Sequence, residues 1–165
     1  MGILYTVWPL DSDMKEWLRS QDIAFPDASS RLPTREEVIQ TLRALRGFRI
    51  RYTENGPGKR WDADITEGQD GEWWTLLHAE PKGDSDLTTE ISFEKGESAL
   101  IVAILRDLSA ATGPLVLMAD VGGAPLVVSQ RYSFAALVQK FSAPEEDEAR
   151  WRRLLESAPG AASTH

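Results

Sequence analysis

The sequence predicts an α+β fold, in which an antiparallel four-stranded meander in the middle of the chain is packed by flanking helices. Of the 165 residues, 42% are hydrophobic and 27% are charged, which is typical of a globular domain. The middle of the chain alternates apolar and polar residues, whereas the segments on either side repeat apolar residues at helical spacing. We therefore expect a single domain over residues 1–157, followed by a flexible tail over residues 158–165.

The first third of the chain predicts one strand and two helices. Residues 3–8 indicate a strand, because the apolar run has neither the basic flank nor the cleavage site of a signal peptide. Residues 11–20 place Met14, Trp17 and Leu18 on one side of a short helix. Thr34 and Glu37 have the spacing of a capping box, so a second helix begins after Thr34 and ends before the glycine at position 47.

The middle of the chain predicts four strands, over residues 48–53, 61–65, 72–80 and 87–94. The sequence Asn55-Gly56-Pro57-Gly58 is rich in turn-forming residues and separates the first two strands. Consecutive short strands of this kind form an antiparallel meander with one apolar and one polar face.

The final third returns to helix. Residues 98–111 are apolar around most of the helix circumference, so this helix is expected at the centre of the core. Two short buried strands, 115–119 and 125–128, follow it. A helix capped by Ser133 and a last helix beginning near Pro144 complete the predicted elements.

Composition excludes several classes of function. The chain has no cysteine, which excludes disulfides and thiolate chemistry and suits a reducing compartment. The longest apolar run, residues 99–105, is far shorter than the ~20 residues of a membrane span, so we expect a cytoplasmic protein with no membrane partner. The net charge of −8 disfavours direct binding of nucleic acid.

The negative charge is concentrated in one stretch of the sequence. Residues 61–100 contain two basic and eleven acidic residues, a net charge of −9, whereas residues 1–60 have a net charge of +2. An acidic surface of this kind attracts a basic partner, but it also keeps many proteins soluble without binding anything.

Asp62 and Asp64 are two residues apart on a predicted strand, so their carboxylates lie on the same face. Such a pair can hold a hard cation or divide acid and base roles. The alternative is structural: if the hairpin closes at the Asn55–Gly58 turn, Arg49 and Arg51 can lie opposite the two aspartates and form exposed ion pairs. The structural interpretation is the more common one for such pairs.

His78 and Glu80 form a second pair on a predicted strand. A histidine can act as a general base, but the sequence offers no nucleophile motif beside it and no second histidine at metal-ligand spacing. Two adjacent tryptophans, Trp73 and Trp74, must point to opposite faces of their strand. If one fills the core, the other can anchor an interface; if helices cover both faces of the sheet, both are buried.

Our first functional hypothesis is an acidic binding protein that engages a basic protein partner, such as an immunity protein that neutralises a bacterial toxin. The predicted partner-binding residues are Asp62, Asp64, Glu72, Trp74 and Glu90, and no cofactor or metal is expected. The alternative is a small hydrolase or metal-dependent enzyme that uses Asp62, Asp64, His78 and Glu80. A third possibility is a subunit that pairs with itself through apolar surface; the sequence leaves the oligomeric state open.

Overall fold

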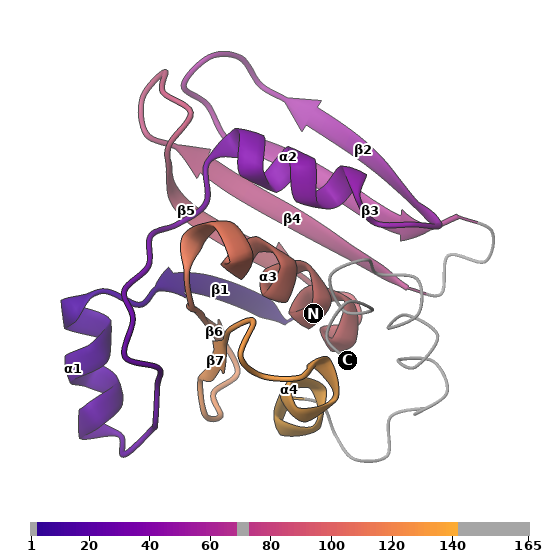
Figure 1. Ribbon diagram of the computed structural model, residues 1–165. Helices are drawn as coiled ribbons and strands as arrows, with labels where there is room; N and C mark the ends of the chain where they lie inside the picture. Colours follow the sequence, from indigo (N-terminus) through magenta and orange to yellow (C-terminus); the bar gives the residue numbers. More distant parts are fainter. Residues whose placement is uncertain (1–2, 69–72, 142–165) are drawn as a thin grey trace.

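The computed structural model describes residues 3–68 and 73–141, which form one seven-stranded antiparallel sheet and four helices (Figure 1). The strands are β1 (Leu4–Pro9), β2 (Phe48–Glu54), β3 (Trp61–Glu67), β4 (Trp74–Pro81), β5 (Thr88–Glu94), β6 (Leu115–Ala119) and β7 (Leu126–Val128). The helices are α1 (Ser12–Ser20), α2 (Arg35–Arg43), α3 (Ser98–Thr112) and α4 (Phe134–Phe141). The mixed helix and sheet composition confirms the α+β class.

The sheet is larger than the predicted meander. Strands β2 to β5 do form a meander of consecutive antiparallel neighbours, but the full order is β2-β3-β4-β5-β1-β6-β7. The N-terminal strand β1 lies between β5 and β6, where Thr6 pairs with Ser92 on one side and Met118 on the other. The sequence pattern identifies each strand but carries no signal for this long-range pairing, because alternation depends on burial and not on the partner strand.

Local capping determines where the first two helices begin. The Asp11 side chain accepts a hydrogen bond from the backbone N–H of Met14, at 2.9 Å, at the start of α1. At the start of α2 the predicted capping box is complete: Thr34 accepts from the Glu37 N–H at 3.1 Å, and the Glu37 carboxylate accepts from the Thr34 N–H at 2.8 Å.

The two faces of the sheet are covered differently. Helices α2, α3 and α4 pack on one face, called here the inner face, together with alternate residues of the strands such as Ile65, Leu77 and Phe93 (Figure 1). On the opposite, outer face, α1 packs through Met14 and Leu18 against Val116 and Val127 of β6 and β7. Among the described elements, no helix covers the outer face of β2 to β5, so this half of the sheet presents its outward side chains.

Helix α3 lies at the centre of the inner layer, as its all-round apolar composition predicted. Twelve of its 15 residues are buried, including Arg106. The Arg106 guanidinium donates hydrogen bonds to the backbone oxygens of Tyr132, at 2.7 Å, and Gln130, at 3.2 Å, which ties the segment before α4 to α3. None of the helices in the described part of the chain has the length and hydropathy that a membrane span requires. The predicted last helix and the tail over residues 158–165 lie outside the described residues.

Candidate functional site

The outer face of β3, β4 and β5 gathers five carboxylates, and we call this surface the acidic face. It arises from strand alternation: Ala63, Leu77 and Ile91 point into the core, so their neighbours along each strand point outward. The carboxylates of the acidic face belong to Asp62, Asp64, Glu80, Glu90 and Glu94.

Two of these carboxylates enclose the histidine. Asp62 lies directly opposite His78 across the β3–β4 pair, and the Asp62 Oδ1 lies 2.5 Å from the His78 Nδ1. On the other side of the ring, the His78 Nε2 lies 3.1 Å from the Glu94 Oε1. His78 is only 7% exposed, although it lies on the open face. The imidazole is therefore held between two carboxylates that come from the strands on either side of it.

Arg60, in the turn before β3, completes this network. Its Nε donates to the Asp62 Oδ1 at 2.9 Å, and its Nη2 lies 2.8 Å from the His78 Nδ1. A guanidinium only donates and a carboxylate only accepts, so Nδ1 can bond to Arg60 or to Asp62 but not to both at once. We assign the bond to Asp62, which is the shorter contact. Burial tends to raise the pKa of Asp62, but the hydrogen bonds from His78 and Arg60 outweigh it and lower that pKa.

This network limits what His78 can do chemically. A general base needs a ring nitrogen that is free to take a proton from a substrate. In the described structure both nitrogens of His78 face carboxylate oxygens, and the ring is nearly inaccessible to solvent. The arrangement is that of a buried structural histidine that joins three strands.

The second aspartate of the predicted pair anchors a tryptophan. The Asp64 Oδ1 accepts a hydrogen bond from the Trp74 Nε1 at 2.8 Å and another from the Thr66 hydroxyl at 3.1 Å. The ring of Trp74 is thereby fixed on the acidic face, where it is partly exposed. Its neighbour Trp73 is 3% exposed and belongs to the inner core. The two adjacent tryptophans thus differ in burial: Trp74 is the first residue of β4, and Trp73 lies in the bend directly before it.

Glu80 and Glu90 form the least compensated part of the acidic face. They lie directly opposite each other across the β4–β5 pair. Neither carboxylate has an ion pair or hydrogen bond with any other residue that the structure describes. Like charges directly opposite on neighbouring strands destabilise a sheet, so this pair costs the isolated protein free energy.

An exposed tryptophan borders the same part of the surface. Trp8 of β1 is 44% exposed. The β1–β5 register ends at the pair of Val7 with Ile91, so Trp8 and Glu90 are the residues that directly follow and precede this last pair on their strands. Two tryptophans therefore accompany the acidic face: Trp8 on β1, the strand that borders β5, and Trp74 at the start of the middle strand β4.

The predicted cross-strand ion pairs are not formed. The hairpin closes as expected, and Arg51 lies opposite Asp64, but Arg49 lies opposite Thr66 and Thr53 lies opposite Asp62. Neither arginine forms an ion pair with a described carboxylate, and both are exposed on the edge strand β2. Asp62 is paired with Arg60 instead.

Most of the residues predicted for partner binding share one surface. Asp62, Asp64, Trp74 and Glu90 all lie on the acidic face, whereas Glu72 lies outside the described residues. Of the residues in the alternative enzyme hypothesis, only Asp62 and His78 touch, while Asp64 is bonded to Trp74. In residues 3–68 and 73–141, no three acidic or histidine side chains are grouped as a metal site would require.

Sequence reasoning missed three residues of this surface: Arg60, Glu94 and Trp8. Glu94 follows Glu90 and Ser92 at two-residue spacing, so alternation could have placed it on the same face. Arg60 lies in a turn, where side-chain direction has no period. Trp8 could not be placed there from sequence, because its position depends on the insertion of β1 beside β5.

Comparison with known proteins adds no assignment. No family model matches the chain, and neither the curated proteins nor the solved structures contain a significant match.

Proposed function

We propose that this protein binds a basic protein partner through the acidic face. The observation that carries the proposal is the Glu80–Glu90 pair, two carboxylates that lie opposite each other without a cation among the described residues. A partner's Lys or Arg side chain placed between them would relieve the repulsion and gain two charge-assisted hydrogen bonds. The repulsion between Glu80 and Glu90 thus lowers the stability of the isolated protein, and a bound basic partner would remove this repulsion.

The aromatic side chains beside the carboxylates support the same proposal. Tryptophans are enriched among the residues that dominate binding energy, and exposed Trp8 lies on β1, the strand that pairs with β5 at the border of the acidic face. Arg and Lys side chains also stack on indole rings. The surrounding carboxylates would accelerate encounter with a basic surface and would make association sensitive to salt.

We propose further that the partner is a toxin whose basic surface normally contacts nucleic acid, so that binding would neutralise it. The support is the charge of the protein and of this face, because a basic site that recognises phosphate also attracts a surface of clustered carboxylates. The enzyme hypothesis has less support, since both ring nitrogens of His78 are occupied.

The test is capture of partners on immobilised protein, followed by affinity measurements with the purified partner. The informative variant is Glu80→Gln/Glu90→Gln, and the matched control is Glu16→Gln/Asp27→Asn, which removes two charges from exposed positions outside the acidic face. We expect the first variant to weaken binding by about tenfold or more and the control by less than about threefold. Affinity should also fall as salt rises.

Two results would contradict the proposal. One is equal affinity of the two double variants, and the other is an affinity that does not change with salt. For the toxin hypothesis, expression of the captured partner alone should arrest growth, and co-expression with this protein should restore it. A partner that is harmless when expressed alone leaves the binding proposal standing and removes the toxin hypothesis.

A further inference from the structure

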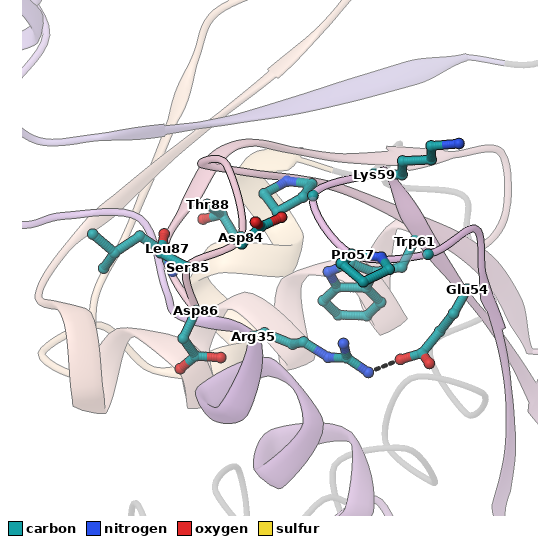
Figure 2. Close-up of a pocket in the computed structure, with 13 residues that line it drawn as sticks. Arg35, Glu54, Pro57, Lys59, Trp61, Asp84, Ser85, Asp86, Leu87 and Thr88 are labelled. Atoms are coloured by element: carbon teal, nitrogen blue, oxygen red, sulfur yellow. Dashed lines mark hydrogen bonds and ion pairs between the residues drawn. The ribbon is translucent and has the colours of Figure 1, made fainter.

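A second candidate site lies apart from the acidic face, at the end of the sheet where three segments meet. These segments are the β2–β3 turn, the β4–β5 loop and the first residue of α2, and they enclose a cavity of about 320 Å³ (Figure 2). Two hydrogen bonds hold the β4–β5 segment to the start of α2 and to the residues before it: the Arg35 N–H donates to the Asp86 carbonyl at 2.9 Å, and the Thr88 hydroxyl donates to the Pro33 carbonyl at 2.7 Å. The cavity has the size of a pocket for a small molecule.

One wall of the cavity contains a buried donor without an acceptor. Trp61 is 3% exposed, and its indole N–H has no hydrogen-bond partner in the described structure. An unsatisfied buried donor costs about 1–3 kcal/mol, and most buried polar groups in folded proteins are paired. The ring of Trp61 lines the cavity, so a ligand there with an acceptor atom could satisfy this donor.

A guanidinium lies over the same indole. The Arg35 Cζ is 5.5 Å from the centroid of the Trp61 ring, and Figure 2 shows the Arg35 side chain extending past the ring to an ion pair with Glu54. A guanidinium has five N–H donors, so it can bind a second carboxylate or exchange one for another. The Arg35 guanidinium and the Trp61 indole thus bring two kinds of donor to the lining of one cavity.

An acceptor without a partner lies on the other side of the cavity. The Asp84 Oδ1 lies against the backbone of Gly58, so close that a Cβ on that glycine would be 2.8 Å away. The Asp84 carboxylate has no hydrogen bond or ion pair among the described residues. The rest of the lining is mixed: Pro57, Pro81 and Leu87 are apolar, whereas Lys59, Ser85, Asp86 and Thr88 are polar or charged.

We infer that this cavity binds a small zwitterion of the amino-acid type. Its carboxylate would accept from Arg35 and Trp61, its ammonium would pair with Asp84, and an apolar side chain would contact the prolines. A ligand with both charges fits better than a simple acid, because a carboxylate alone would face repulsion from the three lining carboxylates, Glu54, Asp84 and Asp86. This inference goes beyond the proposed partner binding and does not depend on it.

The indole N–H of Trp61 provides a direct readout. In a ¹H–¹⁵N spectrum each tryptophan gives a separate indole signal, and the Trp61→Phe variant identifies the one of interest. If that variant does not fold, because Trp61 is a core residue, backbone-linked assignment of the wild type serves instead. Each standard amino acid is then titrated separately, and we expect at least one with an apolar side chain to move the Trp61 signal downfield and saturably.

Matched ligands and variants separate the parts of the inference. For the best amino acid, the analogue without the amine and the analogue without the carboxylate should each bind about tenfold more weakly or worse. Arg35→Gln and Asp84→Asn, both at exposed side chains, should each weaken the amino acid by a similar factor. Glu80→Gln/Glu90→Gln, which tests the acidic face, should leave the titration unchanged.

Two outcomes would overturn the inference: no amino acid moves the Trp61 signal, or the amine-free acid moves it as strongly as the amino acid does. Neither outcome bears on partner binding by the acidic face, because the two experiments use different residues and different readouts.

Discussion

At the scale of single residues, the start of α2 shows how one carboxylate stabilises a helix in two ways. Glu37 closes the capping box with Thr34 and also accepts two hydrogen bonds from Arg31, at 2.7 and 2.8 Å. The hydrogen bonds from Arg31, opposed by partial burial, lower the pKa of Glu37 to about 2. Glu36, in the same turn, makes one exposed contact, with Gln40.

We predict that Glu37→Gln lowers the free energy of unfolding by about 1 kcal/mol at neutral pH. The loss is no larger because the Arg31 side chain is half exposed, so solvent screens its ion pair with Glu37. Because the folded-state pKa is lowered, the wild-type advantage is present above the ordinary pKa of about 4.5 and is lost as pH falls towards about 2. The stability difference is measured by urea unfolding of wild type, Glu37→Gln and the control Glu36→Gln at several pH values between neutral pH and about pH 2. A wild-type advantage that did not change with pH would contradict the prediction.

How far single residues could be predicted depends on whether their partners are local. The Thr34–Glu37 capping box lies within four residues, and the structure confirms it. The different burial of Trp73 and Trp74 was one of the two predicted alternatives, although which of them is buried depends on the helices packed against the sheet. The contact of His78 with Glu94 depends on the register of the β4–β5 pair, which alternation does not specify.

At the scale of elements, the turn between β5 and α3 depends on one glycine. Gly96 has φ +93°, and a Cβ there would lie 1.9 Å from the Trp74 carbonyl oxygen and 2.7 Å from the Thr75 Cα. These are backbone atoms of β4 and cannot move aside cheaply. By contrast, Gly56, at φ +110° in the β2–β3 turn, has no atom within 4 Å of the Cβ position.

We expect Gly96→Ala to destabilise the protein by more than about 3 kcal/mol, since it combines backbone strain with a steric clash. Gly56→Ala should cost about 1 kcal/mol, from backbone strain alone. Chemical denaturation of both variants measures the difference. Similar losses for the two variants would mean that the β5–α3 turn can move away from β4.

The uncompensated carboxylates of the acidic face make a prediction for the β4–β5 pair. Glu80→Gln should raise the free energy of unfolding by up to about 0.5 kcal/mol, because it removes the repulsion from Glu90. Glu90→Gln should have a similar effect, and the double variant should add little to either, because one substitution already removes the repulsion. A double-mutant cycle with additive effects would show that the two carboxylates do not interact.

Periodicity in the sequence locates the strands and helices closely, including the short strands β6 and β7, because each element buries one face. It does not give the order β2-β3-β4-β5-β1-β6-β7. Only the pairing of strands that are joined by short turns could be predicted, since a short turn limits where the next strand can lie.

At the scale of the whole molecule, the net charge of −8 is distributed unevenly, with a net charge of −9 in residues 61–100. We expect the melting temperature of the isolated protein to rise as salt is increased from about 0.01 M to about 0.15 M, because screening reduces repulsion between carboxylates. The rise should be smaller in Glu80→Gln/Glu90→Gln. Calorimetry of the wild type and the variant at several salt concentrations checks both expected rises. A melting temperature that fell with salt would show that the loss of stabilising ion pairs by screening outweighs the relief of repulsion.

The central place of β1 has a consequence for biosynthesis. This strand leaves the ribosome before the other strands of the sheet, and its pairing partners, such as Ser92 and Met118, are translated much later. The hairpins of β2 to β5 can form as they emerge, whereas β1 must wait for β5 to pair with one of its edges and for β6, made after α3, to pair with the other. The nascent chain therefore carries an apolar strand with unpaired backbone groups until β5 has been made, and we expect a chaperone that recognises such segments to bind it during this interval.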